Sequence, residues 1–279
     1  MSLGRRIGRL ALGTGVFAAA LAVTFPTDAL VRAVVARATP PGHPALVFAR
    51  AHLRPGGVRL EDVALRRPDG WAIATADWVE VRPSWHGLVR DGTGQPWAVR
   101  SVACGGQIDA TVTRDVVEVG WQGVDLARCA PLAVTGEAIA GIADGRATVR
   151  LVAMAPATAE GSLRIQAAAW RVAGRLPGLD TLHADPALLR FALRDGELLL
   201  DGIDLYGPDV EATGRGSVRL AGLGNLAHSP VDVALAVVPG RAATPLVRDL
   251  LTMLPPADTG AGAYRLALTG TLSEPRLAR

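Results

Sequence analysis

A twelve-residue stretch of the chain, VRLEDVALRRPD at residues 58–69, carries the clearest information about the fold, because it recurs. It aligns without gaps on LLLDGIDLYGPD at residues 198–209, with leucine, an acid, a β-branched residue, leucine, proline and aspartate at the same offsets. The core of this unit occurs a third time as GVDL at residues 123–126. Recurrence of this kind is typical of a fold that is built from similar structural units.

Apolar and polar residues alternate within each copy, and this alternation predicts β-strands. The apolar positions change parity midway, as between Leu60 and Val63, which requires a β-bulge or a sharp bend. Repeated bent strands predict a curved sheet with one apolar inner face. We expect six leucines on that inner face: Leu60, Leu65, Leu200, Leu205, Leu266 and Leu268.

The same alternation continues at residues 163–170, 231–238 and 264–269, and turn-forming Pro, Gly and Asp residues separate the alternating runs. The sequence therefore predicts a mainly β fold, with a curved, mostly antiparallel, repeated sheet that forms a groove or an open half-barrel. A few short helices are expected, at Pro186 to Arg190 and from Thr244-Pro245 to Pro255 among others. Two arrangements remain open: the inner face shelters apolar matter, or it closes on itself as the core of a sandwich.

The N-terminal residues predict a membrane anchor, because Arg5, Arg6 and Arg9 precede an uncharged run at 10–25. This order leaves the N-terminus in the cytoplasm and exports the rest of the chain. The run is shorter than the ~20 residues of a typical spanning helix, so cleavage after Ala20-Leu21-Ala22 remains an alternative. The expected anchor residues include Leu10, Val16, Phe17, Leu21 and Phe25.

A short amphipathic helix is expected directly after the anchor, with Leu30, Val31, Val34 and Val35 on one stripe that lies on the outer surface of the membrane. The predicted organisation is an anchor and helix at 1–41 and a periplasmic β domain at 42–279. Internal repeats divide that domain at about 45–135 and 140–279.

The predicted export to the periplasm also affects the expected oxidation state of the two cysteines, Cys104 and Cys129. Neither belongs to a CxxC motif. An oxidising periplasm favours a disulfide between them, and two unrelated buried thiols are the alternative.

Catalytic, metal and cofactor motifs are not expected in this chain. The five histidines are scattered, the acids near residue 200 lack the spacing of a calcium loop, and the glycine pairs complete no phosphate-binding motif. All basic side chains other than histidine are Arg, spread among apolar residues rather than clustered, so we expect no nucleic-acid partner. The sequence therefore predicts a protein that is not an enzyme.

Four segments resemble the type II secretion system protein N family (GspN): FPTD at 25–28, GVRLEDVAL at 57–65, VEVRPS at 79–84 and YRLALTGTLSEP at 264–275. The resemblance implies a single-pass inner-membrane protein that is an accessory component of the type II protein secretion system, with envelope proteins as partners. This family is similar in turn to AsmA-like envelope proteins, which implies the alternative of lipid binding or lipid transfer, with phospholipid in an apolar β groove. Inner-membrane lipids are the remaining expected partners.

Overall fold

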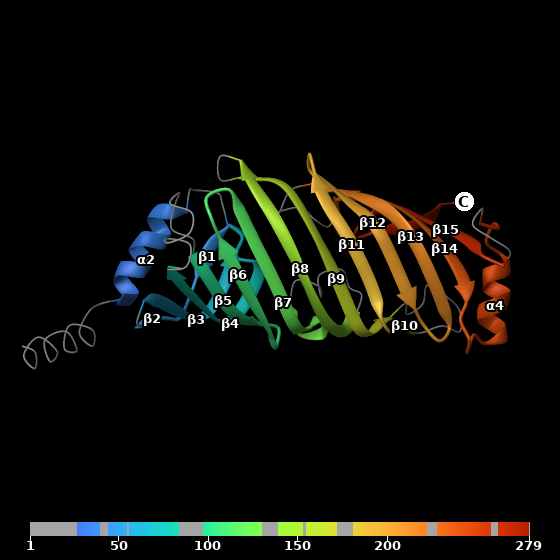
Figure 1. Ribbon diagram of the computed structural model, residues 1–279, viewed down its shortest axis with the longest axis horizontal. Helices are drawn as coiled ribbons and strands as arrows, with labels where there is room; N and C mark the ends of the chain where they lie inside the picture. The colour runs from blue at the N-terminus through green and yellow to red at the C-terminus, as the bar shows by residue number, and fades with distance from the viewer. Residues whose placement is uncertain are drawn as a thin grey trace, which may run out of the picture.

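The computed structural model describes residues 27–39, 44–54, 56–83, 97–129, 139–152, 155–171, 181–221, 228–257 and 262–278. Its strands form a single sheet of 16 strands, which is mainly β as the alternation predicts. Figure 1 shows the sheet as one long twisted layer, with helix α2 at one end and helix α4 at the other. Because every described strand belongs to this one sheet, the described residues do not form a sandwich.

The first half of the chain begins with α2 (Thr27–Ala38) and continues in strands. These are β1 (Ala45–Val47), β2 (Arg50–Arg54), β3 (Gly57–Arg66), β4 (Ala72–Pro83), β5 (Trp97–Ala103), β6 (Gly106–Val112), β7 (Val116–Asp125) and β8 (Ile139–Val152), with the 3-10 turn η1 (Leu126–Arg128) after β7.

The second half contains eight strands and one helix. They are β9 (Ala155–Arg171), β10 (Thr181–Ala184), β11 (Ala187–Arg194), β12 (Glu197–Tyr206), β13 (Val210–Arg219), β14 (Pro230–Pro239), α4 (Pro245–Thr252), β15 (Tyr264–Thr271) and β16 (Pro275–Ala278).

Every described strand pairing is antiparallel, and successive strands are almost always neighbours in the sheet. Three short strands depart from this meander. β1 and β2 pair with different parts of the same edge of β3, and β10 pairs with the end of β9 beyond the segment that pairs with β11. The short turns predicted between alternating segments therefore produce a meander, which requires no crossover connections.

The predicted parity changes are confirmed, and they take two forms. In β3, Asp62 has a φ of 50° while the pairing with β4 keeps the same register on both sides of it. In β12, the pairing with both neighbours shifts by one residue between Leu200 and Ile203, which is a β-bulge. A shift of the same kind occurs in β7, where Gly123 has a φ of 66°. A bend and two bulges therefore keep the apolar positions of each strand on one face.

Helix α2 occupies the region where a short helix was expected, but only part of its apolar stripe packs against the sheet. Val31 and Val35 pack against the sheet, whereas Leu30 and Val34 are 51% and 60% exposed. Contacts at the sheet end hold the helix in place. The Asp28 carboxylate accepts a hydrogen bond from the backbone N–H of Ala51 at 2.5 Å, and the Arg32 guanidinium donates one to the carbonyl of Ala49.

Helix α4 begins and ends where the sequence indicated. The Thr244 hydroxyl caps it by accepting from the backbone N–H of Val247, and proline occupies the first turn. The expected helix at Pro186 to Arg190 is wrong, because Ala187 to Arg194 form strand β11. Leu189, Arg190 and Phe191 alternate between apolar and polar, which fits a strand, and proline is tolerated immediately before one.

The expected anchor residues Leu10, Val16, Phe17, Leu21 and Phe25 lie outside the described residues. In the described part of the chain, neither helix has the length and hydropathy needed to cross a membrane.

Candidate functional site

One face of the sheet is apolar along almost its whole length. Residues that pair directly across antiparallel strands point to the same face, so the strand register identifies the side chains that share it. One row of paired residues runs from β3 to β15: Leu60, Val79, Ser101, Ile108, Trp121, Gly145, Leu163, Leu189, Ile203, Gly214, Leu235 and Leu266. A neighbouring row that includes Val99, Val119 and Phe191 brings Leu200 and Leu268 onto the same face.

The six leucines expected on the inner face therefore lie on one side of the sheet, but their burial differs. Leu60 is 5% exposed and belongs to a buried cluster with Phe48, Ala51 and Val63. The other five are only half-buried. Leu205 and Leu266 pack against a second cluster, which is formed by α4 and strands β13 and β14.

The two clusters lie at opposite ends of the apolar face, each beneath a helix (Figure 1). Val31 and Val35 of α2 pack against the cluster at β2 and β3, and Val247 and Leu251 of α4 belong to the cluster at β13 and β14. Between them, neither α2 nor α4 packs on β5 to β11, and large side chains such as Phe191 and Leu163 are only half-buried there. At about 4.8 Å per strand, these six neighbouring strands give an open apolar surface roughly 25 Å across.

The opposite face carries charged side chains in register. Its central row contains Arg59, Glu80, Arg100, Asp109, Gly120, Arg146, Ser162, Arg190 and Gly202. A groove of about 1290 Å³ follows this row from β4 to β12. Its lining includes the members of the row from Glu80 to Arg190 and neighbours such as Arg82, Glu118 and Glu160. The groove has charged side chains of both signs along its length.

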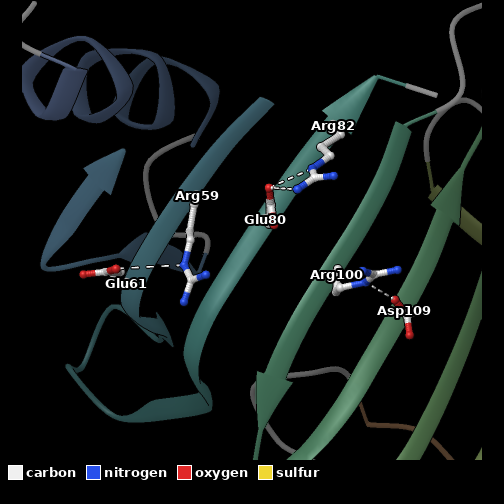
Figure 2. Close-up of polar contacts among 6 residues, drawn as sticks. All are labelled: Arg59, Glu61, Glu80, Arg82, Arg100 and Asp109. Atoms are coloured by element: carbon white, nitrogen blue, oxygen red, sulfur yellow. Dashed lines mark hydrogen bonds and ion pairs between the residues drawn. The ribbon is translucent and has the colours of Figure 1, made fainter. Parts of the chain in front are cut away.

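Ion pairs organise the charges of this groove at β4 to β6 (Figure 2). The Arg82 Nε donates to Glu80 Oε1 at 2.7 Å, and Glu80 is buried although it is acidic. The Arg100 Nε donates to Asp109 Oδ1 at 2.8 Å, which lowers the pKa of the Asp109 carboxyl and raises the pKa of Arg100. Arg59 lies over the ring of Trp78, with its guanidinium carbon 4.4 Å from the ring centroid.

From β7 onward the charges of the groove are arranged differently. Glu118, Arg146, Glu160 and Arg190 line the groove, and the structure shows no ion pair for them within the described ranges. The Arg190 guanidinium instead lies against Gly202, where a Cβ would stand 2.7 Å from its Nη2 atom. This half of the groove can form new polar contacts with a ligand or a partner without first breaking an internal ion pair.

The structure joins Cys104 and Cys129 in a disulfide, with their Cα atoms 5.2 Å apart. Cys104 begins the β5–β6 turn and Cys129 follows η1, so the bond ties this turn to the end of β7. The backbone N–H of Asp125 also donates to the carbonyl of Cys104 at 3.0 Å. Within the described ranges, no three His, Cys, Asp or Glu side chains gather in a way that could hold a metal ion.

The sequence analysis identified the apolar face but did not identify the charged row. The signal was present in the alternating Glu80 and Arg82 and in Arg100 and Asp109. Its detection requires the strand register, which aligns residues from distant hairpins. With the geometry established, comparison with known proteins adds no identification: no family model, curated protein or solved structure matches this chain.

Proposed function

We propose that the protein is an accessory component of the type II protein secretion system, and that its β domain lies in the periplasm and binds envelope partners. One observation carries the proposal: a single continuous sheet presents two extended faces and its edges as surface. The four segments that resemble the type II secretion system protein N family support the secretion assignment. In this proposal the N-terminal segment is a single-pass inner-membrane anchor with its N-terminus in the cytoplasm.

Sheet edges and groove charges are the features that suit partner binding. An edge strand offers unpaired N–H and C=O groups that accept a further strand. The charges of the polar groove that lack described ion pairs, among them Glu118 and Arg146, can select a partner of complementary charge pattern. In this proposal these contacts bind and orient other proteins, and no chemical transformation is required.

Gene deletion in a bacterium that carries both this protein and a type II system tests the proposal. We expect exported folded enzymes to accumulate in the periplasm and to fall in the medium, and the intact gene to restore their release. A double variant, Glu118→Arg with Glu160→Arg, should restore less secretion than the intact gene because it changes the charge of the groove. Neither residue belongs to a buried cluster, so the fold should be kept. Unchanged secretion in the deletion strain would rule out the secretion role.

Lipid binding is the second candidate, and the open apolar surface between α2 and α4 favours it specifically. Its width of roughly 25 Å exceeds the depth of the hydrocarbon layer of one leaflet, which is about 15 Å. An acyl chain lying across β5 to β11 would cover the half-exposed Phe191 and Leu163 and remove their apolar surface from water. The AsmA-like resemblance supports the same reading.

Native mass spectrometry of the full chain, released from a mild detergent, tests whether the protein binds lipid. Bound phospholipid is expected, and Phe191→Arg should reduce it because the guanidinium would lie within the apolar surface. Thr148→Arg, on the opposite face, is the matched control and should leave the bound lipid unchanged. A protein without lipid, or equal lipid in both variants, would remove the second candidate.

A further inference from the structure

Strands β4 and β5 differ in length, and the difference leaves part of β4 without a neighbour. β4 spans Ala72–Pro83, whereas β5 spans Trp97–Ala103 and pairs with β4 only from Trp78 to Pro83. On its other side β4 pairs with β3 down to Ala72. Within the described ranges, no strand pairs with Ala72 to Asp77 on the side away from β3, and no other backbone hydrogen bond is made there. We refer to this segment as the β4 edge.

The β4 edge begins beside an exposed aromatic side chain. Trp71 directly precedes β4 and is 53% exposed. Its backbone is fixed, because its N–H donates to the Asp69 carboxylate and its carbonyl accepts from the N–H of Arg67. Rigid, exposed tryptophan is the side chain most often found at the centre of protein–protein contacts.

A small pocket lies beside the other end of the β4 edge. It has a volume of about 300 Å³, and its lining includes Asp62 and Ala64 of β3, Thr75 and Asp77 of β4, and Gly105 and Arg128. The disulfide Cys104–Cys129 and the contact of Arg128 with Gly105 hold the rim of this pocket in place. The pocket is therefore preformed, which lowers the entropic cost of binding.

The two acidic residues of this pocket, Asp62 and Asp77, hold corresponding positions on neighbouring strands. Glu61 pairs with Trp78, and Val63 pairs with Ala76. Asp62 and Asp77 lie between these two pairs, so they stand opposite each other on neighbouring strands. Like charges directly opposite each other destabilise a sheet. Both side chains are exposed, and the structure shows no ion pair for either among the described residues. A cationic side chain placed between them would relieve this repulsion.

We propose that the β4 edge binds an extended segment of a partner protein as an added strand, with a Lys or Arg side chain of that segment between Asp62 and Asp77. Backbone hydrogen bonds to Ala72 through Asp77 supply affinity, and the pocket and Trp71 supply specificity. The edge is roughly 20 Å long at about 3.3 Å per residue, which accommodates a segment of six or seven residues. The inference rests on the partner binding proposed above and names its edge and the chemistry of its ligand. Failure of the peptide tests below would overturn this edge as the binding site, whereas the gene deletion tests the secretion role separately.

Hydrogen exchange of the full chain in detergent micelles gives the first test. Alternate amides of residues 72–77 should exchange as fast as amides in exposed turns, because only every second amide points towards β3. Amides of residues 78–81, where β4 pairs with both β3 and β5, should be protected on both sides of the strand. Slow exchange of every amide in 72–77 would show that the edge is already paired, and would overturn the proposal.

Selection from a random heptapeptide library displayed on phage, with the full chain as target, gives the second test. Synthetic copies of the enriched peptides should contain Lys or Arg among β-branched residues, and their binding should slow exchange at residues 72–77. Asp62→Asn combined with Asp77→Asn should weaken their binding about tenfold or more, as measured by fluorescence anisotropy.

Asp249→Asn on the exposed surface of α4 is the matched control and should leave peptide binding unchanged. Failure to enrich any such peptide would overturn the proposal. Peptides that bind the double variant as tightly as the original chain, or that leave exchange at residues 72–77 unchanged, would overturn it equally.

Discussion

At its two ends the apolar face lies beneath a helix, whereas across its middle no described helix covers it. The ends contain buried clusters that include Leu60 beneath α2 and Val237 beneath α4. In the middle, the buried apolar residues of this face are small or medium-sized, such as Ala143 and Val124, and large ones such as Phe191 are only half-buried. The difference indicates that helix packing stabilises the ends, while strand pairing and the disulfide stabilise the middle and leave its apolar face accessible.

Substitution of one leucine by aspartate at an end and in the middle tests this comparison most strongly. Leu60→Asp places a carboxylate in the cluster beneath α2, where Leu60 is 5% exposed, and should cost more than about 4 kcal/mol of stability. Leu163→Asp changes a half-exposed position in the same row and should cost about 1 kcal/mol. Urea unfolding of the full chain, followed by circular dichroism, measures both values. Equal losses would show that the middle is as buried as the end.

Removal of the disulfide tests how much the bond contributes to the stability of the sheet at β5 to β7. The bond closes a segment with a sequence separation of 25 residues, so Cys104→Ala with Cys129→Ala should cost about 3 kcal/mol. Thermal melting of the oxidised chain, the reduced chain and the double variant provides the measurement. The reduced chain and the variant should melt at similar temperatures, both well below the oxidised chain. A variant that melts with the oxidised chain would show that the bond contributes nothing to the fold.

The sequence predicted those parts of the fold that depend on local patterns. Alternation around Leu200 and Leu266 identified strands and their apolar face, and Thr244-Pro245 identified the start of α4. Pro186 misled the analysis because proline before a strand and proline at the start of a helix look alike in sequence.

Features that depend on the pairing of distant segments could not be predicted. Arg59, Arg100 and Arg146 share a row only because of the register of successive hairpins. The β4 edge exists only because β4 is longer than β5, and no pattern within either strand fixes that difference. The difference in exposure between the apolar residues of α2 has the same origin, because the position of the sheet end decides that Val31 is partly buried and Leu30 is exposed.

Substitutions of two glycines of β7 test how much backbone conformation contributes to the stability of the middle of the sheet. Gly123 lies at the bulge with a φ of 66°, and Gly123→Ala should cost about 1 kcal/mol because L-residues are strained there although the space is open. Gly120→Ala is the matched control, because Gly120 has no positive φ and its nearest potential contact is 3.9 Å away. Melting temperatures measure both effects. A neutral Gly123→Ala would show that the bulge tolerates a different backbone conformation.

The smallest expected effect concerns the ion pair between Arg100 and Asp109 on the polar face. The hydrogen bond from Arg100 lowers the pKa of the Asp109 carboxyl below its ordinary value of 3.8. Because the pKa is lower in the folded than in the unfolded chain, the pair stabilises the fold above about pH 4 and loses this contribution as pH falls through the folded pKa. Both side chains are more than half exposed, so water and salt screen the pair and the contribution is small.

The melting temperature of the original chain should fall between about pH 7 and about pH 3. In Asp109→Asn this fall should be smaller by about one degree. High salt should shrink this difference further, because screening weakens an exposed ion pair. Asp232→Asn, at an exposed position of β14, is the control and should leave the pH dependence as it is. A large effect of Asp109→Asn that resists salt would mean that the polar groove is shielded from water, which would place a bound partner over β4 to β6 and make both faces of the sheet covered surfaces.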